Sequence, residues 1–145
     1  MQGVSRRLED ARSNGSVRSL KGRKCRFDLW EPKGFEMKKA LPKEEALVTY
    51  GQTTQLKRAF TYKALNRLIQ ASAADMTKQA MVNLYNQGIT PLLQIHDELD
   101  CSVKDIAAAQ EIARSMETAL ELRVPSKCDI DLGPSWGEAK EVKYV

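Results

Sequence analysis

The sequence is poor in the residues that usually build zinc sites and disulfide frameworks. It has one histidine, His96, and three widely spaced cysteines, Cys25, Cys101 and Cys128, which form no CxxC pair. This set contains no recognisable zinc-ligand pattern, so reduced cysteines that pack as small apolar residues are the better interpretation. No apolar run approaches the roughly 20 residues of a membrane span, and the basic start of the chain lacks the apolar core of a signal peptide. These absences favour a cytoplasmic protein with no membrane partner.

The charge of the chain is distributed unevenly. Its 145 residues carry 23 Lys+Arg and 19 Asp+Glu, for a net charge of +4. Residues 1–67 hold 16 basic and 7 acidic side chains, a net +9, whereas residues 68–145 hold 7 and 12, a net −5. A basic half suits a polyanion, because each neutralised phosphate releases counterions. A Lys-rich surface that is merely solvated is an equally open alternative.

The first half of the chain predicts a helix followed by a hairpin. Val4–Arg12 is a candidate helix, closed by the turn signal Ser13-Asn14-Gly15. Ser16–Leu20 and Cys25–Trp30 then alternate polar with apolar residues around Lys21-Gly22-Arg23-Lys24, which predicts a β-hairpin with a basic tip. Glu31–Pro42 is broken by proline and glycine and is expected to be a loop.

The second half predicts an α+β fold. A helix is expected from about Thr61 to Gln87, and two short strands, 92–95 and 99–103, should flank His96-Asp97-Glu98. A second helix, capped by Asp105, should end at Val124-Pro125. Cys128, Ile130 and Leu132 then alternate as a further strand, so the expected packing is an antiparallel sheet backed by long helices. The residues expected on the inner face of the first helix are Leu65, Leu68, Ile69, Ser72, Met76, Ala80, Met81 and Leu84.

Asp97 and Glu98 are the residues with the clearest chemical potential. They lie at the tip of a hairpin whose strands are apolar and are expected to be buried. Adjacent carboxylates at a rigid tip suit Mg²⁺, which takes few oxygen ligands from protein and the rest from phosphates and water. The alternative is that the two acids only decorate a turn, where aspartate is common.

Four segments carry a resemblance to a known family. Gln94-Ile95-His96-Asp97-Glu98-Leu99 resembles motif C of family A, DNA polymerase I-like DNA polymerases, the hairpin at the centre of the palm domain. Asn66–Asp75, continuing into Lys78–Met81, is similar to the helix that precedes this motif. Gly22-Arg23-Lys24 resembles the family's basic hairpin, and Gly133-Pro134-Ser135-Trp136 resembles a sequence near its C-terminus. The order of the segments matches the family over essentially the whole chain, and an insert at about Pro32–Gln55 looks most like bacteriophage members.

The resemblance implies a role for each matched residue. Asp97 would be a catalytic metal ligand in a two-metal Mg²⁺ site, Glu98 its acidic neighbour, and His96 a residue near the primer terminus. The side chains implied in DNA binding are Gln70, Asn66, Arg23, Lys24 and, at a position that is often basic in the family, Tyr62. Asn66 and Gln70 would donate to minor-groove acceptors common to all base pairs, although an ordinary solvated helix face is the alternative. Arg23 and Lys24 would hold backbone phosphate.

The implied activity is template-dependent nucleotidyl transfer on a DNA primer-template with deoxynucleoside triphosphates. Related single-subunit RNA polymerases usually carry serine after the aspartate, so Glu98 favours the DNA enzyme. Residues 1–60 would be the end of the fingers, the basic hairpin and the insert loop, and residues 61–145 the C-terminal palm segment. The host cytoplasm is the expected location if a phage encodes the chain.

The other half of the family's active site has no counterpart in this sequence. Neither the motif A strand, with the second metal-binding aspartate, nor the motif B fingers helix is recognisable. We therefore expect an incomplete palm that is inactive until an N-terminal polymerase chain supplies motifs A and B. Two alternatives are a non-catalytic DNA-binding palm fragment and a helical-hairpin interaction protein without a nucleic-acid role, which leaves the ordered motifs unexplained.

Overall fold

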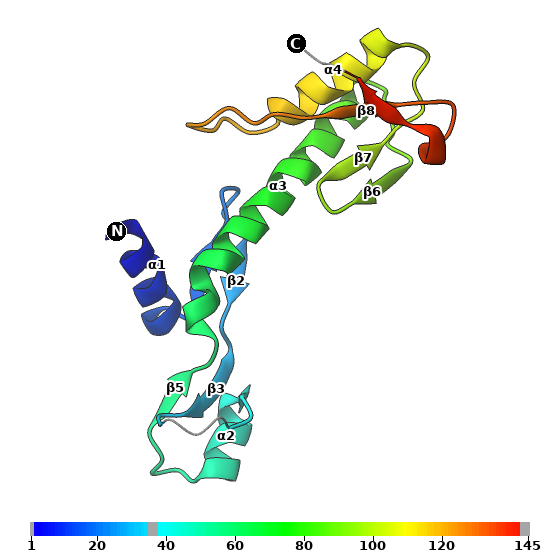
Figure 1. Ribbon diagram of the computed structural model, residues 1–145. Helices are drawn as coiled ribbons and strands as arrows, with labels where there is room; N and C mark the ends of the chain where they lie inside the picture. Colours follow the sequence, from blue (N-terminus) through cyan, green and yellow to red (C-terminus); the bar gives the residue numbers. More distant parts are fainter. Residues whose placement is uncertain (1, 35–37, 143–145) are drawn as a thin grey trace. The chain divides into compact units, whose positions relative to one another are not determined.

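The computed structural model describes residues 2–34 and 38–142, which form two compact units, Met1–Ser72 and Ala73–Val145 (Figure 1). Unit 1 contains α1 (Gln2–Ser13), β1 (Ser16–Arg18), β2 (Lys24–Arg26), β3 (Leu29–Pro32), β4 (Leu41–Pro42), α2 (Lys43–Tyr50), β5 (Leu56–Arg58) and the short 3-10 helix η1 (Thr61–Lys63). The long helix α3 (Ala64–Asn86) contributes to both units. Unit 2 adds β6 (Leu93–Ile95), β7 (Glu98–Asp100), α4 (Ile106–Glu117), β8 (Ile130–Leu132), the 3-10 helix η2 (Trp136–Glu138) and β9 (Lys140–Val142). The mixture of helices and antiparallel strands confirms the α+β class.

The core of unit 1 lies between α1, the β1–β2 hairpin and the start of α3. Ala11, Val17, Phe27 and Ala64 are each at most 2% exposed. Within β1 the side chain of Val17 is buried while that of Arg18 is exposed, as the alternation of a half-buried strand requires. The predicted first helix and the predicted hairpin are therefore both present, with shorter strands than the sequence pattern suggested.

Hydrogen bonds fix the β1–β2 hairpin to α3 within unit 1. The backbone N–H of Leu20 donates to Ser72 Oγ at 3.2 Å, and Arg23 Nη2 donates to the carbonyl of Ala71 at 2.9 Å. Arg67 Nη1 donates to the carbonyl of Arg26 at 2.7 Å. The hairpin is thus held at both ends of its second strand by the same helix.

The prediction that Glu31–Pro42 is a loop is wrong in part. The segment begins in β3 and ends in β4. The strand β3 pairs with both β4 and β5, and α2 directly follows β4 along the chain (Figure 1). Trp30 belongs to β3 and not to the hairpin strand that contains Cys25. The two prolines are compatible with this small sheet because Pro32 ends its strand and Pro42 occupies the N-cap of α2.

Arg58 of β5 ties the small β3–β4–β5 sheet to the core of unit 1. Its Nη1 donates to the carbonyl of Phe27 at 2.9 Å, and its guanidinium lies 4.6 Å from the centre of the Trp30 ring. Gly15, with φ +69°, lies directly beneath this group, and a Cβ at that position would be 2.5 Å from Arg58 Cζ. Glycine is required here both by the left-handed backbone after α1 and by the close approach of Arg58.

Unit 2 is built on α4 and the second half of α3. Ala109 and Ala113 of α4 pack on Ile130 of β8, and Ala80 and Leu84 of α3 are almost fully buried. The Asp105 side chain accepts a hydrogen bond from the backbone N–H of Ala108 at 2.8 Å, which confirms the predicted N-cap.

Two predicted helix features differ from the structure. The helix α4 ends at Glu117 instead of reaching Val124-Pro125, because Thr118 takes a non-helical conformation and its hydroxyl donates to the Arg114 carbonyl. On α3, Ile69 is 56% exposed although it falls on the predicted inner face.

The strands of unit 2 form two separate antiparallel pairs, β6–β7 and β8–β9. A single continuous sheet was expected, but in residues 38–142 the two pairs share no strand. Within the described ranges, no helix is both long and apolar enough to cross a membrane.

Candidate functional site

The β6–β7 hairpin presents the acidic residues at its tip. Its register pairs Leu93 with Asp100 and Ile95 with Glu98, so His96 and Asp97 are the two central residues of the turn. His96 has φ +52°, the left-handed value that the tight hairpin turns require at their first central position. The side-chain amide of Gln94 donates to the carbonyl of His96 and braces this turn. A short hairpin with a braced turn therefore holds Asp97 and Glu98 as neighbours.

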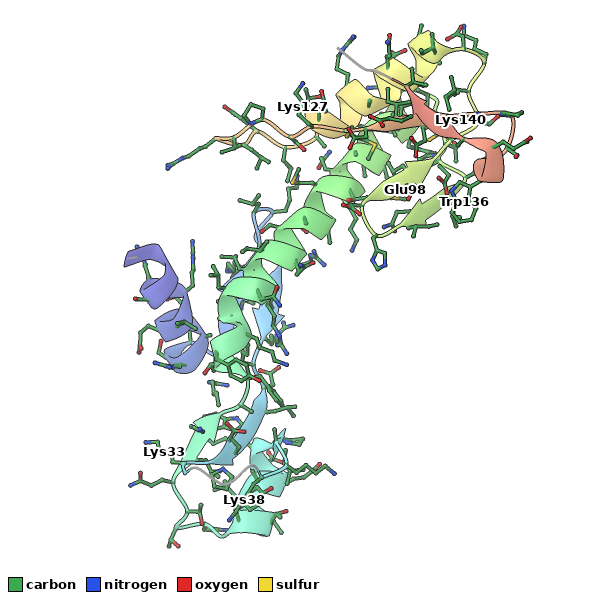
Figure 2. The ribbon with its side chains drawn as sticks, viewed as in Figure 1. Lys33, Lys38, Glu98, Lys127, Trp136 and Lys140 are labelled. Carbon is green, nitrogen blue, oxygen red and sulfur yellow. The ribbon has the colours of Figure 1, made fainter. Side chains whose placement is uncertain are left out.

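The expectation that buried strands flank this turn is wrong. Leu92 and Leu93 are 73% and 49% exposed, and His96, Asp97 and Glu98 are all exposed. Figure 2 shows Glu98 on this hairpin with its side chain drawn. Apolar alternation buries a strand only where another layer covers it, and the described part of unit 2 supplies no such layer over β6. Both carboxylates are thus open to a ligand from solution.

The carboxylates fit part of a magnesium site. Two exposed carboxylates on one rigid turn are compatible with Mg²⁺, which is commonly held by one or two protein carboxylates together with substrate phosphates. Within residues 2–34 and 38–142, no group of three or more His, Cys, Asp or Glu side chains gathers in a way that could hold a metal. The hairpin can therefore supply some of the oxygen ligands of a metal ion, and ligands from elsewhere must complete the coordination.

The residues implied in minor-groove contact lie on unit 1. Asn66 and Gln70 are four residues apart on α3 and both are exposed, which places them on one accessible face of the helix. Tyr62 is 68% exposed and lies in η1, before α3 begins, instead of inside the helix. The left-handed Phe60, with φ +59°, precedes η1 and delays the start of α3.

The basic hairpin differs in detail from the sequence expectation. Lys24 begins β2 and is exposed, whereas the Arg23 guanidinium donates to the Ala71 carbonyl of α3. Sequence reasoning missed Arg18 and Arg26, which share the exposed face of the hairpin with Lys24. The signal was present, because Lys24 and Arg26 alternate with Cys25 along a strand of period two.

The cysteines behave as packing residues. All three are free and half-buried. Burial raises the pKa of the Cys101 thiol, and the Asp100 carboxylate adds to the effect. Burial, with the carboxylates of Glu117 and Asp129, raises the pKa of Cys128. A thiol with a raised pKa is a weak nucleophile and a poor metal ligand, so neither residue is suited to chemistry.

Comparison with known proteins identifies the family. The family model for DNA polymerase family A matches residues 3–138. The chain is 36% identical over 129 residues to a DNA-directed DNA polymerase of Pseudomonas phage M6, covering 89% of this chain and 16% of that protein. It is 31% identical over 145 residues to the thermostable DNA polymerase I of Thermus caldophilus, covering 94% of this chain and 15% of that enzyme.

A solved structure gives the same result at the level of the fold. The POL domain of Pol1 from M. smegmatis, in complex with DNA primer-template and dNTP, superposes with a TM-score of 0.56 at 26% sequence identity. The match covers 86% of this chain and 20% of that chain, so the chain spans only a small part of the length of its relatives. The chain belongs to DNA polymerase family A.

Proposed function

We propose that this chain supplies the carboxylate hairpin and part of the primer-template contact surface of a DNA-directed DNA polymerase. The observation that carries the proposal is the exposed His96-Asp97-Glu98 turn, held by a two-strand hairpin inside the region that matches the family. In this proposal Asp97 is a Mg²⁺ ligand, Glu98 is its acidic neighbour and His96 lies beside the primer terminus. The substrates are a DNA primer-template and deoxynucleoside triphosphates, and the chain acts in the cytoplasm, that of the host if a phage encodes it.

Two metal ions in such a site would neutralise the transferred phosphoryl group and lower the pKa of the attacking hydroxyl. The part played by this chain is positional. The β6–β7 register places Asp97 in the turn and Glu98 at the start of β7, and the Gln94 amide braces the turn. A turn whose backbone is braced in this way offers both carboxylates to a cation from a fixed position on the chain.

A second carboxylate donor is needed because the hairpin offers ligands on one side only. We propose that another polypeptide segment, carrying the family's motifs A and B, completes the site. The exposure of Leu92 and Leu93 beside the turn supports this proposal, since apolar side chains next to a catalytic turn are normally covered. Nucleotide transfer by this chain alone is then not expected.

The contacts to DNA come from unit 1 in this proposal. Asn66 and Gln70 donate to minor-groove acceptors, which A·T and G·C pairs share, so the enzyme tolerates every sequence. Lys24 of β2 binds phosphate, and the exposed Tyr62 of η1, directly before α3, is a further contact. Arg23 holds the hairpin against α3 through its bond to the Ala71 carbonyl, and it is also proposed to lie beside backbone phosphate.

Primer extension tests the proposal. The purified chain is assayed with Mg²⁺ and four nucleotides, first alone and then mixed with a family A polymerase from which the matched region has been removed. Extension is expected only in the mixture, and Asp97→Asn should abolish it. Asp105→Asn is the matched control, because it makes the same chemical change at a helix cap that asparagine still serves.

Three results, from this assay and from a parallel measurement of DNA binding, contradict parts of the proposal. Incorporation by the purified chain alone would refute the need for a second segment. Full activity of the Asp97→Asn mixture would refute the metal-ligand role. DNA binding without extension in any mixture would support the alternative, a non-catalytic DNA-binding palm fragment.

A further inference from the structure

The outer face of the β1–β2 hairpin carries three cations. In the antiparallel register Arg18 lies directly opposite Lys24, and Ser16 lies opposite Arg26. Arg18, Lys24 and Arg26 are all exposed, while Val17 and Cys25 point to the other face and pack in the core of unit 1. The three positive side chains thus lie within a few residues of one another on a single surface.

The direct pairing of Arg18 with Lys24 is unfavourable for the hairpin itself. Like charges opposite each other on an antiparallel pair destabilise it, and the Cα atoms of such a pair are only about 5 Å apart. Among the residues that the structure describes, none of these three cations forms an ion pair with an acidic side chain. The three exposed cations are therefore available to an anion from outside the fold.

The neighbouring arginines Arg23 and Arg67 are engaged with α3 and with the core of unit 1. Arg23 donates to the Ala71 carbonyl, and the guanidinium of Arg67 lies 4.6 Å from the centre of the Phe27 ring. Arg18 also makes one internal bond, from Nη1 to the Gly22 carbonyl at 2.7 Å, which holds its guanidinium close to the turn. The other N–H groups of the Arg18 guanidinium can donate to a second partner. A guanidinium can form two parallel hydrogen bonds to a phosphate group.

The chemistry of this surface favours phosphate over bases. The single aromatic residue next to β2, Phe27, is 2% exposed, so this face offers no ring on which a base could stack. A twisted two-stranded ribbon with three cations and no stacking platform recognises a backbone and not a sequence. Duplex DNA, with regularly spaced phosphates, is the polyanion that fits a polymerase segment.

We propose that the outer face of the β1–β2 hairpin binds the phosphodiester backbone of duplex DNA through Arg18, Lys24 and Arg26. The identity of the polyanion rests on the proposed function, whereas the existence of an anion site rests on the unpaired like charges of the hairpin. Arg18 and Arg26 add two contacts with DNA phosphate to the one proposed for Lys24. Lys24 lies opposite Arg18 and two residues before Arg26 on β2.

The test measures binding of the full chain to a short labelled duplex by fluorescence anisotropy, without Mg²⁺ or nucleotides. Each phosphate contact contributes about 0.9 to the slope of log affinity against log salt. Replacing Arg18 and Arg26 together by glutamine should therefore reduce that slope by about two and weaken binding at 50 mM salt by at least tenfold. Between 50 and 200 mM salt, the affinity of the double variant should fall about 12-fold less than that of the unmodified chain.

Two controls separate the site from general charge and from folding. Arg114→Gln with Arg123→Gln removes the same charge from exposed positions of unit 2 and should leave the slope unchanged. The thermal midpoint of the Arg18→Gln variant should change little, because removal of the like-charge pair offsets loss of the Arg18 bond to the Gly22 carbonyl. Arg18→Lys with Arg26→Lys keeps the charge and should retain most of the slope.

Equal salt slopes for the Arg18/Arg26 double variant and the unit 2 control would overturn the proposal. Single-stranded DNA bound as tightly as duplex would overturn the choice of duplex. This assay needs no catalysis, so it is independent of primer extension. Loss of DNA affinity in the variants stands even if no mixture extends a primer, and successful extension does not rescue the hairpin site if the slopes agree.

Discussion

Replacing Gly15 with alanine should destabilise unit 1 by displacing Arg58. The position has φ +69°, and a Cβ there would lie 2.5 Å from Arg58 Cζ and 2.6 Å from its Nη1. Both distances are far shorter than a van der Waals contact, so the guanidinium has to move away from the carbonyl of Phe27. The change thus affects the backbone and a side-chain contact at once.

The magnitude follows from three contributions. A left-handed conformation costs an L-residue about 1–2 kcal/mol. Loss of the hydrogen bond from Arg58 to the Phe27 carbonyl costs about 1 kcal/mol, and loss of the cation–π contact with Trp30 about 0.5 kcal/mol. Gly15→Ala should therefore lower the free energy of unfolding by about 3 kcal/mol.

A double-mutant cycle with Arg58→Ala isolates the steric part. Where Arg58 has already been truncated, Gly15→Ala should cost only the backbone contribution, about 1.5 kcal/mol. Urea unfolding of the four proteins, followed by tryptophan fluorescence, measures the coupling, since Trp30 itself lies under Arg58. Additive effects of the two substitutions, to within about 0.5 kcal/mol, would refute the reasoning that Gly15 is needed to seat Arg58.

Three further predictions concern unit 2. Asp105→Ala should lower the free energy of unfolding by about 1 kcal/mol through loss of the N-cap of α4, measured by urea unfolding. Leu84→Ala should cost about 3 kcal/mol because Leu84 is 0% exposed, whereas Val82→Ala, at a 53% exposed position of the same helix, should change stability by less than about 0.5 kcal/mol. Burial raises the pKa of Cys101 and of Cys128, so iodoacetamide should alkylate both more slowly in the folded than in the unfolded chain at pH 8. By linkage, their contribution to stability is full below the unfolded thiol pKa of about 8.5 and is lost as pH rises above it, and equal alkylation rates in the two states would contradict this.

The parts of the fold that sequence predicted well depend on local patterns. The 23 residues of α3 follow from helical spacing, and its C-terminal end follows from Gly88. The cap at Asp105 and the β6–β7 hairpin likewise need only neighbouring residues to be recognised. Each of these features follows from residues that are close together in the sequence.

The features that sequence could not predict depend on contacts with residues that are distant in the sequence. Leu93 and Ile69 fall on apolar faces, yet both are largely exposed, because burial is decided by a covering layer and not by the face itself. The pairing of Glu31 with Lys57 joins residues from the two ends of the insert, which no local pattern reveals. The position of the Arg23 guanidinium was unpredictable for the same reason, since its acceptor is a carbonyl of α3.

The candidate site was predicted in part. His96, Asp97 and Glu98 were singled out from their resemblance to motif C together with the helix that precedes it, and the structure adds that the turn is exposed and braced by Gln94. Their chemical roles remain predictions. Arg18 was missed because its importance lies in the cross-strand register, which a reading of consecutive residues does not give.

The pairing of β3 with β5 has a consequence for how this chain can change. The backbone N–H of Lys33 donates to the Gln55 carbonyl at 2.9 Å, so the segment between them leaves the chain and rejoins it at the same point. A segment with adjoining ends can be lengthened, exchanged or lost in evolution without shifting the polypeptide on either side. For the same reason, this junction is a natural place to splice in a reporter or a tether, because the helix and hairpins that precede and follow it would keep their register.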